Sequence, residues 1–220
     1  MLTAAQVRGL APLPADLVLP APTPEPPWHC RVTAVVWWHR ATPAAVQRLS
    51  PALRDVRRVP LTVVGLLRYL DSPVGGYAEL LASPVLLSVR GPRAVITDIA
   101  VDDLVSLAGG RAHWALPKVL ARFTGEPAAP PRSVVGDGWS ITADGLPGRL
   151  PPLPVGLPLG AVHPWPDGRV LRSVTRLSGW ARPARVEVAS TGVLAGWVRP
   201  GRHSGVVLRD ARLVVGRPRG

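Results

Sequence analysis

The sequence has almost no lysine. Only one of its 26 basic residues is a lysine, Lys118, and all the others are arginine. A guanidinium group keeps its proton and cannot attack a carbonyl, whereas an uncharged lysine amine can. Because apolar residues surround it in the sequence, Lys118 is a candidate nucleophile that forms a Schiff base (imine) with a ketone. The alternative is a lysine that has survived by chance on a solvated surface.

Cysteine is equally scarce, since Cys30 is the only one. A single cysteine excludes an intrachain disulfide and is typical of the reducing cytosol, so we expect a cytoplasmic protein. The N-terminal stretch does not have the pattern of a signal peptide. No apolar run approaches the ~18 residues that are needed to cross a bilayer, so we expect no membrane partner.

Acidic residues are few, 14 against 26 basic ones, and the formal net charge is +12. The arginines are nevertheless scattered, and the densest group is Arg54, Arg57 and Arg58. Because the chain has neither a basic block nor an RNA-binding or zinc-finger signature, we do not expect nucleic acid as a partner. The charge is better interpreted as a source of solubility and of attraction for small anions.

The common catalytic signatures are also missing. The chain has no G-x-S-x-G nucleophile motif, no G-x-G-x-x-G segment and no P-loop. Its five histidines are dispersed and show no recognised metal-ligand spacing. We therefore expect no cofactor and no metal.

Hydrophobic residues make up 47% of the chain, enough for a substantial core, and most lie in short β-branched or aromatic runs. Strands are predicted at 31–38, 59–69, 77–81, 85–90, 94–101, 133–142, 170–177, 184–189, 193–198 and 205–215. Turns are predicted at 71–76 and 144–145, and the proline-rich stretch 146–166 is predicted to be a surface connection. This pattern favours a mainly β (α+β) fold, an antiparallel barrel or sandwich, as one domain over 1–220.

Two short helices are predicted. Thr42 as N-cap and Pro43 as first helical residue start one over 42–49. Asp102 and Asp103 favour the start of another over 102–108, with Gly109 or Gly110 as its left-handed stop. Repeated prolines oppose regular structure in residues 1–27, which are predicted to form an extended arm.

Three segments occur in a characteristic order. Pro26-Pro27-Trp28 precedes Arg31, Pro73-Val74-Gly75-Gly76-Tyr77-Ala78-Glu79 follows, and Gly110-Arg111 leads through Trp114 to Pro117-Lys118. This pattern resembles the acetoacetate decarboxylase family, with its P-x-G-x-Y-x-E and G-R-x-x-x-x-x-P-K segments. The resemblance covers about 26–123 and weakens afterwards.

The resemblance implies a cone-like β-barrel of the acetoacetate decarboxylase type with a buried lysine, and the family tendency is towards a homo-oligomer. Lys118 matches the lysine that forms an imine with a small keto acid, and the imine accepts the electrons released as CO2 leaves. Glu79 matches a carboxylate near the imine, and we expect it to reach the substrate rather than the free amine. Lys118 and Glu79 are therefore the candidate catalytic residues.

The candidate substrate-binding residues are Arg31, Arg111, Tyr77 and Trp114. The resemblance implies that Arg31 meets an anionic substrate, and surface exposure is its alternative. Arg111 either touches substrate or holds the loop that precedes Lys118. Tyr77 and Trp114 have core packing as their alternative.

The sequence departs from the family at two positions. Val119 stands where the decarboxylase has a second lysine, and counting back from Glu79 puts a second pocket glutamate at about Val64. The primary hypothesis is a Schiff-base-forming carbon–carbon lyase. The alternatives are an aldolase-dehydratase on pyruvate-like keto acids, a non-catalytic binding protein for a hydrophobic carboxylate and, least favoured, a basic nucleic-acid module.

Overall fold

The computed structural model describes residues 10–11, 13–21, 23–89 and 91–220. The helices are α2 (Pro43–Gln47) and α3 (Leu104–Trp114), and a 3-10 turn spans Pro51–Leu53. The strands are β1 (Trp28–Arg40), β2 (Arg58–Asp71), β3 (Tyr77–Ser88), β4 (Gly91–Ala94), β5 (Asp98–Val101), β6 (Lys118–Leu120), β7 (Arg122–Thr124), β8 (Ser133–Gly136), β9 (Trp139–Pro147), β10 (Leu153–Pro164), β11 (Val170–Gly192) and β12 (Gly201–Val215).

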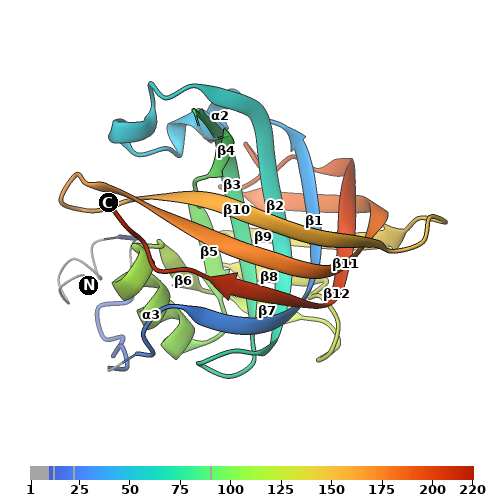
Figure 1. Cartoon of the computed structure of the whole chain (residues 1–220), viewed down its shortest axis with the longest axis horizontal. Helices are drawn as coiled ribbons and strands as arrows, with labels where there is room; N and C mark the ends of the chain where they lie inside the picture. Colours follow the sequence, from blue (N-terminus) through green and yellow to red (C-terminus); the bar gives the residue numbers. More distant parts are fainter. Residues whose placement is uncertain (1–9, 12, 22, 90) are drawn as a thin grey trace.

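The strands form one sheet, and seven of them close into a ring. Neighbours run in the order β10–β4–β3–β2–β1–β12–β11, and β11 also pairs with β10, which closes a ring. Strands β9, β8 and β7 continue from β11, while β5 and β6 branch from β3. All pairings are antiparallel except β10–β4 and β5–β6. The predicted mainly β fold is confirmed, and α2 and α3 lie at opposite ends of the view in Figure 1.

The structure corrects the prediction that 146–166 is a surface connection. This region contains the end of β9 and the whole of β10, which pairs with β11 from Leu153 to Pro164. On its other side β10 pairs only at Ala161, with Ala94 of β4. Most of β10 therefore has one free edge, and an edge strand tolerates proline because it needs no second row of hydrogen bonds.

Other strand boundaries also differ from the prediction. The ranges 77–81 and 85–90 form the single strand β3, with Arg90 outside the described residues, and 170–177 and 184–189 are both parts of β11. The range 94–101 divides into β4 and β5, and 133–142 divides at a tight turn between β8 and β9. Asp144 and Gly145 lie inside β9, where the absent side chain of Gly145 makes room for Val35.

Residues 193–198 form turns rather than the predicted strand. The backbone N–H groups of Trp197 and Val198 both donate to the carbonyl of Leu194, so the hydrogen bonds are local. All three side chains are nevertheless buried in the core. The apolar run predicted burial correctly and backbone conformation wrongly.

Helix α2 follows the prediction, because Thr42 caps it and Pro43 is its first residue. Helix α3 starts as predicted, with the Asp103 carboxylate accepting from the N–H of Ser106 at 2.6 Å. Its predicted glycine stop is wrong. The helix runs through Gly109 and Gly110 to Trp114, and Ala115 adopts the left-handed conformation that ends it.

The glycines of α3 serve close packing instead. A Cβ atom at Gly109 would lie 2.7 Å from the Trp28 ring, and one at Gly110 would lie 2.5 Å from Cε of Lys118. Glycine costs helix stability but lets another group approach the helix backbone. The Gly109-Gly110 pair therefore brings α3 against both β1 and the candidate nucleophile.

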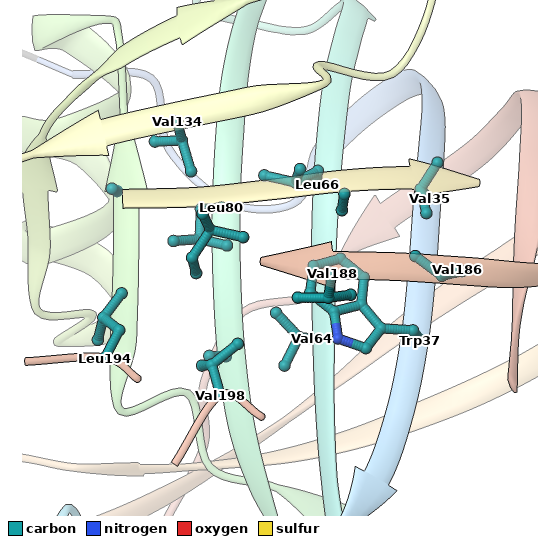
Figure 2. Close-up of a cluster of buried hydrophobic side chains, with 14 of the residues drawn as sticks. Val35, Trp37, Val64, Leu66, Leu80, Val134, Val186, Val188, Leu194 and Val198 are labelled. Carbon is teal, nitrogen blue, oxygen red and sulfur yellow. The ribbon is translucent and has the colours of Figure 1, made fainter. Parts of the chain in front are cut away.

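Two large clusters of buried side chains lie on opposite faces of β2 and β3. One contains Val64, Leu66 and Leu80, together with Trp37 of β1 (Figure 2). The other contains Leu67 and Tyr69 of β2, Tyr77 of β3 and several residues of β1, β12 and α3. Side chains alternate between the two faces along a strand. The even-numbered positions of β2 and β3 therefore point into the first cluster, and the odd-numbered positions point into the second.

The N-terminal segment has no helix or strand in its described part before Trp28. Leu13 and Leu19 pack against the second cluster, and Thr23 Oγ1 lies 3.0 Å from Nε2 of His113 in α3. The first nine residues of the predicted arm, and positions 12 and 22, lie outside the described residues. Across the part of the chain that the structure describes, no helix is both long and apolar enough to span a membrane.

Candidate active site

Lys118 and Glu79 form a buried ion pair. Nζ of Lys118 lies 2.8 Å from Oε2 of Glu79, and the two side chains are 3% and 5% exposed. Removing both charges from water is costly, and their mutual attraction offsets that cost only in close geometry such as this. The expectation that Glu79 avoids the free amine is wrong, because the carboxylate contacts it directly.

The strand register puts these two residues on the same face of the sheet. Glu79 of β3 pairs with Val101 of β5, and Lys118 of β6 pairs with Ile99 of β5. Ile99 and Val101 are two residues apart and therefore point to the same side of β5. Glu79 and Lys118 thus face each other across a short intervening strand, although 39 positions separate them in the sequence.

Two further side chains complete the cluster. The Lys118 amine donates to Oγ of Ser106 at 2.9 Å, and the Tyr69 hydroxyl donates to Oε1 of Glu79 at 3.0 Å. Each oxygen of the carboxylate therefore has its own hydrogen-bond donor. The sequence analysis missed both residues. Ser106 lies one turn after the Asp103 cap, and Tyr69 lies directly opposite Tyr77 in the β2–β3 hairpin.

Tyr77 forms an aromatic wall of the site. Its ring centroid lies 5.3 Å from Nζ of Lys118, and its ring stacks on that of Tyr69 with centroids 4.1 Å apart. Burial raises the pKa of both tyrosines well above the usual value, and the neighbouring Glu79 carboxylate raises each further. Both phenols therefore stay protonated, and Tyr69 remains a hydrogen-bond donor to Glu79.

Cys30 lies within the electrostatic reach of the pair. Burial raises the pKa of its thiol from 9.0 to about 12, and Glu79 adds to this effect while Lys118 opposes it. A thiol with so high a pKa is a poor nucleophile at neutral pH. Lys118 is thus the one group of the cluster whose uncharged form is a strong nucleophile.

Arg111 is fully buried and braces the backbone around Lys118. Its Nε donates to the carbonyl of Lys118 at 2.8 Å, and a terminal nitrogen donates to the carbonyl of Ala11 at 3.0 Å. Burial lowers the pKa of its guanidinium to about 10. Of the two roles that the sequence left open for Arg111, these contacts support holding the segment.

Trp114 and Arg31 do not belong to the polar group around Lys118 and Glu79. Trp114 packs edge-on against Trp28 at 5.0 Å, and its Nε1 donates to the carbonyl of Gly216, so it is a core residue. Arg31 lies on the outward face of β1 and pairs with Asp210 at 2.8 Å, with both side chains more than half exposed. The structure thus puts Arg31 apart from Lys118 and Glu79, because its neighbour Cys30 takes the inward position, and its role in substrate binding stays a prediction.

The two departures from the family pattern also lie away from the site. Val64 packs with Trp37 in the cluster of Figure 2, and Val119 packs against the same cluster. Both point to the opposite face from Lys118 and Glu79. The β2 residue that reaches Glu79 is Tyr69.

No group of three or more His, Cys, Asp or Glu side chains among the described residues is placed to hold a metal ion. Two surface hollows, one lined by Arg40 and its neighbours and the other by Trp180 and its neighbours, include neither Lys118 nor Glu79.

Neither the protein-family models nor the curated proteins gave a match to this chain. Solved structures did match. An acetoacetate decarboxylase aligns over 99% of this chain and 97% of its own, with a TM-score of 0.65 and 14% identity. The acetoacetate decarboxylase of Legionella pneumophila aligns over 100% and 95%, with a TM-score of 0.60 and 15% identity.

A third match is the enduracididine biosynthesis enzyme MppR complexed with pyruvate, over 88% of this chain and 90% of the other, with a TM-score of 0.59 and 16% identity. The structure is thus that of a mainly β protein with a buried Lys118–Glu79 ion pair. The chain has the fold of acetoacetate decarboxylase.

Proposed function

We propose that the protein is a Schiff-base-forming, cofactor-independent carbon–carbon lyase that acts on a small keto acid through an imine on Lys118. The observation that carries this proposal is the 2.8 Å contact between the only lysine side chain and a buried carboxylate. The shared fold supports it, since the matched structures include acetoacetate decarboxylases and an enzyme complexed with pyruvate.

Glu79 is the proposed proton acceptor that activates the amine. In a dry site, transfer of the proton from the Lys118 ammonium to the Glu79 carboxylate replaces two buried charges by two neutral groups. The freed amine then attacks the ketone carbon, and Glu79 returns the proton to the hydroxyl that leaves as water. The product of these steps is a protonated imine beside a carboxylate.

The imine then acts as the electron sink. As the carbon–carbon bond to the carboxylate breaks, its electron pair enters the imine and forms an enamine, and CO2 leaves. Protonation of the enamine carbon and hydrolysis by water release the ketone and restore the lysine. Ser106, which already contacts Nζ at 2.9 Å, is positioned to hydrogen-bond the nitrogen during these steps.

An aldolase-dehydratase on pyruvate-like keto acids is the second candidate. It is favoured by a structure of MppR with the condensation product of pyruvate and imidazole 4-carboxaldehyde, which matches this chain with a TM-score of 0.57. The non-catalytic binding protein was an alternative because Val64 and Val119 would make the pocket more apolar. Both side chains instead pack with the cluster that contains Trp37, on the opposite face from Lys118 and Glu79, so the structure does not favour this alternative. Cytoplasmic location and homo-oligomerisation stay predictions.

The test is borohydride trapping of the imine, followed by mass spectrometry. With pyruvate, the peptide that carries Lys118 is expected to gain the mass of pyruvic acid less one oxygen. With acetoacetate, a decarboxylase leaves an isopropyl group on the lysine, whereas an adduct that keeps its carboxyl group favours the aldolase alternative. Because Lys118 is the only lysine, the N-terminal amine is the only other primary amine.

Two variants make the test specific. Lys118→Arg removes the nucleophile but keeps a positive charge. Lys118→Met removes it with a side chain smaller than that of arginine. Neither variant is expected to form an adduct at position 118. Glu79→Gln keeps a hydrogen-bonding group of the same size but cannot accept the proton, so trapping slows by about a hundredfold or more. Equal labelling of the parent protein and the folded Lys118 variants would overturn the proposal.

A further inference from the structure

A second site lies around α2, far from α3 in Figure 1. There the end of β1, the start of β2 and the loop before β12 surround a hollow of about 820 Å³. Small-molecule sites in proteins usually measure roughly 300–1,000 Å³. The hollow shares no lining residue with the Lys118 cluster.

Three arginines and no acidic residue line this hollow. They are Arg40, Arg58 and Arg199, and all three are exposed to solvent. Arg58 donates to the carbonyls of Arg54 and Val56, contacts that leave its charge unneutralised. Within the described residues, no carboxylate pairs with the guanidinium of Arg40 or Arg199, whereas Arg48 nearby pairs with Asp98 and Arg202 pairs with Glu187.

The local structure holds the backbones of Arg40 and Arg199 close to one another. His39 Nδ1 lies 3.0 Å from the carbonyl of Arg40, and its Nε2 lies 3.3 Å from the backbone nitrogen of Arg199. The His39 imidazole therefore joins two chain segments that are distant in sequence. Burial lowers the pKa of this imidazole, the hydrogen bond to the Arg40 carbonyl opposes that effect, and the Arg199 charge lowers the pKa further.

The rest of the lining is mostly apolar. It includes Ala45 and Val46 of α2, Leu61 of β2 and Pro84 of β3. A cationic rim beside an apolar wall suits a ligand with an anionic head and a short hydrocarbon body. Guanidinium groups bind carboxylate and phosphate oxygens in pairs, which favours these two head groups over a simple halide.

We propose that this hollow binds a small organic anion, with its carboxylate or phosphate group held by Arg40, Arg58 and Arg199 and its hydrocarbon part against the apolar wall. The site is independent of the proposed lyase chemistry. The Lys118→Arg variant is therefore expected to bind the anion as the parent protein does, so failure of one proposal leaves the other intact.

Isothermal titration calorimetry tests the proposal with four probes: acetate, octanoate, inorganic phosphate and octyl phosphate. We expect saturable binding of octanoate or octyl phosphate with a Kd of about 1 mM or lower. Each methylene that contacts the wall strengthens binding by about fourfold, so the short probes bind more weakly. The stronger of the two long probes identifies the head group.

The critical comparison uses two double variants that remove equal charge. Arg40→Gln with Arg199→Gln is expected to weaken binding by about tenfold or more. Arg122→Gln with Arg176→Gln removes two exposed arginines outside the hollow and is expected to leave the Kd unchanged. Absence of saturable binding, equal losses in both double variants or equal affinity for short and long probes would each overturn the proposal.

Discussion

Gly110 lies against the side chain of Lys118, so closely that a Cβ atom at Gly110 would come within 2.5 Å of Cε and 2.7 Å of Cδ. The helix that carries Gly110 thus packs directly against the Lys118 side chain. The position of the Nζ atom depends on the absence of a single methyl group.

This relationship makes Gly110→Ala a specific test of the site. The added methyl must push the lysine away from Glu79 and Ser106, and we expect imine trapping to slow by about tenfold or more. Overpacking costs about 1–3 kcal/mol, which the better helix propensity of alanine partly offsets. Trapping kinetics and urea unfolding measure the two effects separately.

Gly109→Ala is the matched control. Its methyl group would meet the Trp28 ring at 2.7 Å and would not touch Lys118. We expect a similar loss of stability with trapping kinetics close to those of the parent protein. If both variants slow trapping equally, the Gly110 contact has no specific role.

The sole cysteine reports on the electrostatics of the site. A pKa raised from 9.0 to about 12 leaves about a thousandfold less thiolate at neutral pH. We therefore expect iodoacetamide to alkylate Cys30 at least a thousandfold more slowly in the folded protein than in urea, since burial also limits access. Glu79→Gln removes one cause of the raised pKa and is expected to speed the reaction in the folded state. Rapid alkylation of the folded parent protein would contradict this description of the cluster.

The buried His163 side chain is expected to make the folded protein less stable in acid. It lies buried beside Ser173, with Nε2 2.7 Å from the hydroxyl oxygen, and burial lowers its pKa from 6.5 to about 4. Between these values the unfolded chain binds a proton that the folded protein does not bind, so stability falls as the pH decreases through this window. The contribution is about 3 kcal/mol in total.

Urea unfolding at pH 7 and pH 4.5 measures this effect. We expect the parent protein to lose about 2–3 kcal/mol more than His163→Gln between the two values. If the variant does not fold, an NMR titration of the His163 ring in the parent protein gives its pKa directly. Parallel losses of stability, or a ring that titrates near pH 6.5, would contradict the prediction.

Local chemistry made several features of the fold predictable. Thr42 and Asp103 cap their helices as their side chains suggest, because capping involves only the next three residues. Runs of β-branched and aromatic residues indicated β1 and β2, because strand preference is also a property of neighbouring residues. The sequence motifs also selected Lys118 and Glu79 as candidate catalytic residues, but the direct contact between them was not predicted.

Features that depend on partners distant in sequence were predicted poorly. Gly109 and Gly110 have the pattern of a helix stop, yet Trp28 and Lys118 need the space that these glycines leave inside α3. The prolines of 146–166 suggested a loop, yet a strand with a free edge accommodates them. At the two glycines, close tertiary packing outweighed a local preference of about 1 kcal/mol.

The sequence by itself determined which residue can form an imine, because Lys118 is the only side chain with a primary amine. It also determined that the chain is mainly β, because strand-forming runs dominate it. Only the tertiary structure decided that Ser106 and Tyr69 belong to the cluster and that Arg31 and Val64 do not. The physical reason is that the face of a strand on which a side chain lies depends on register, and a shift of one residue reverses it.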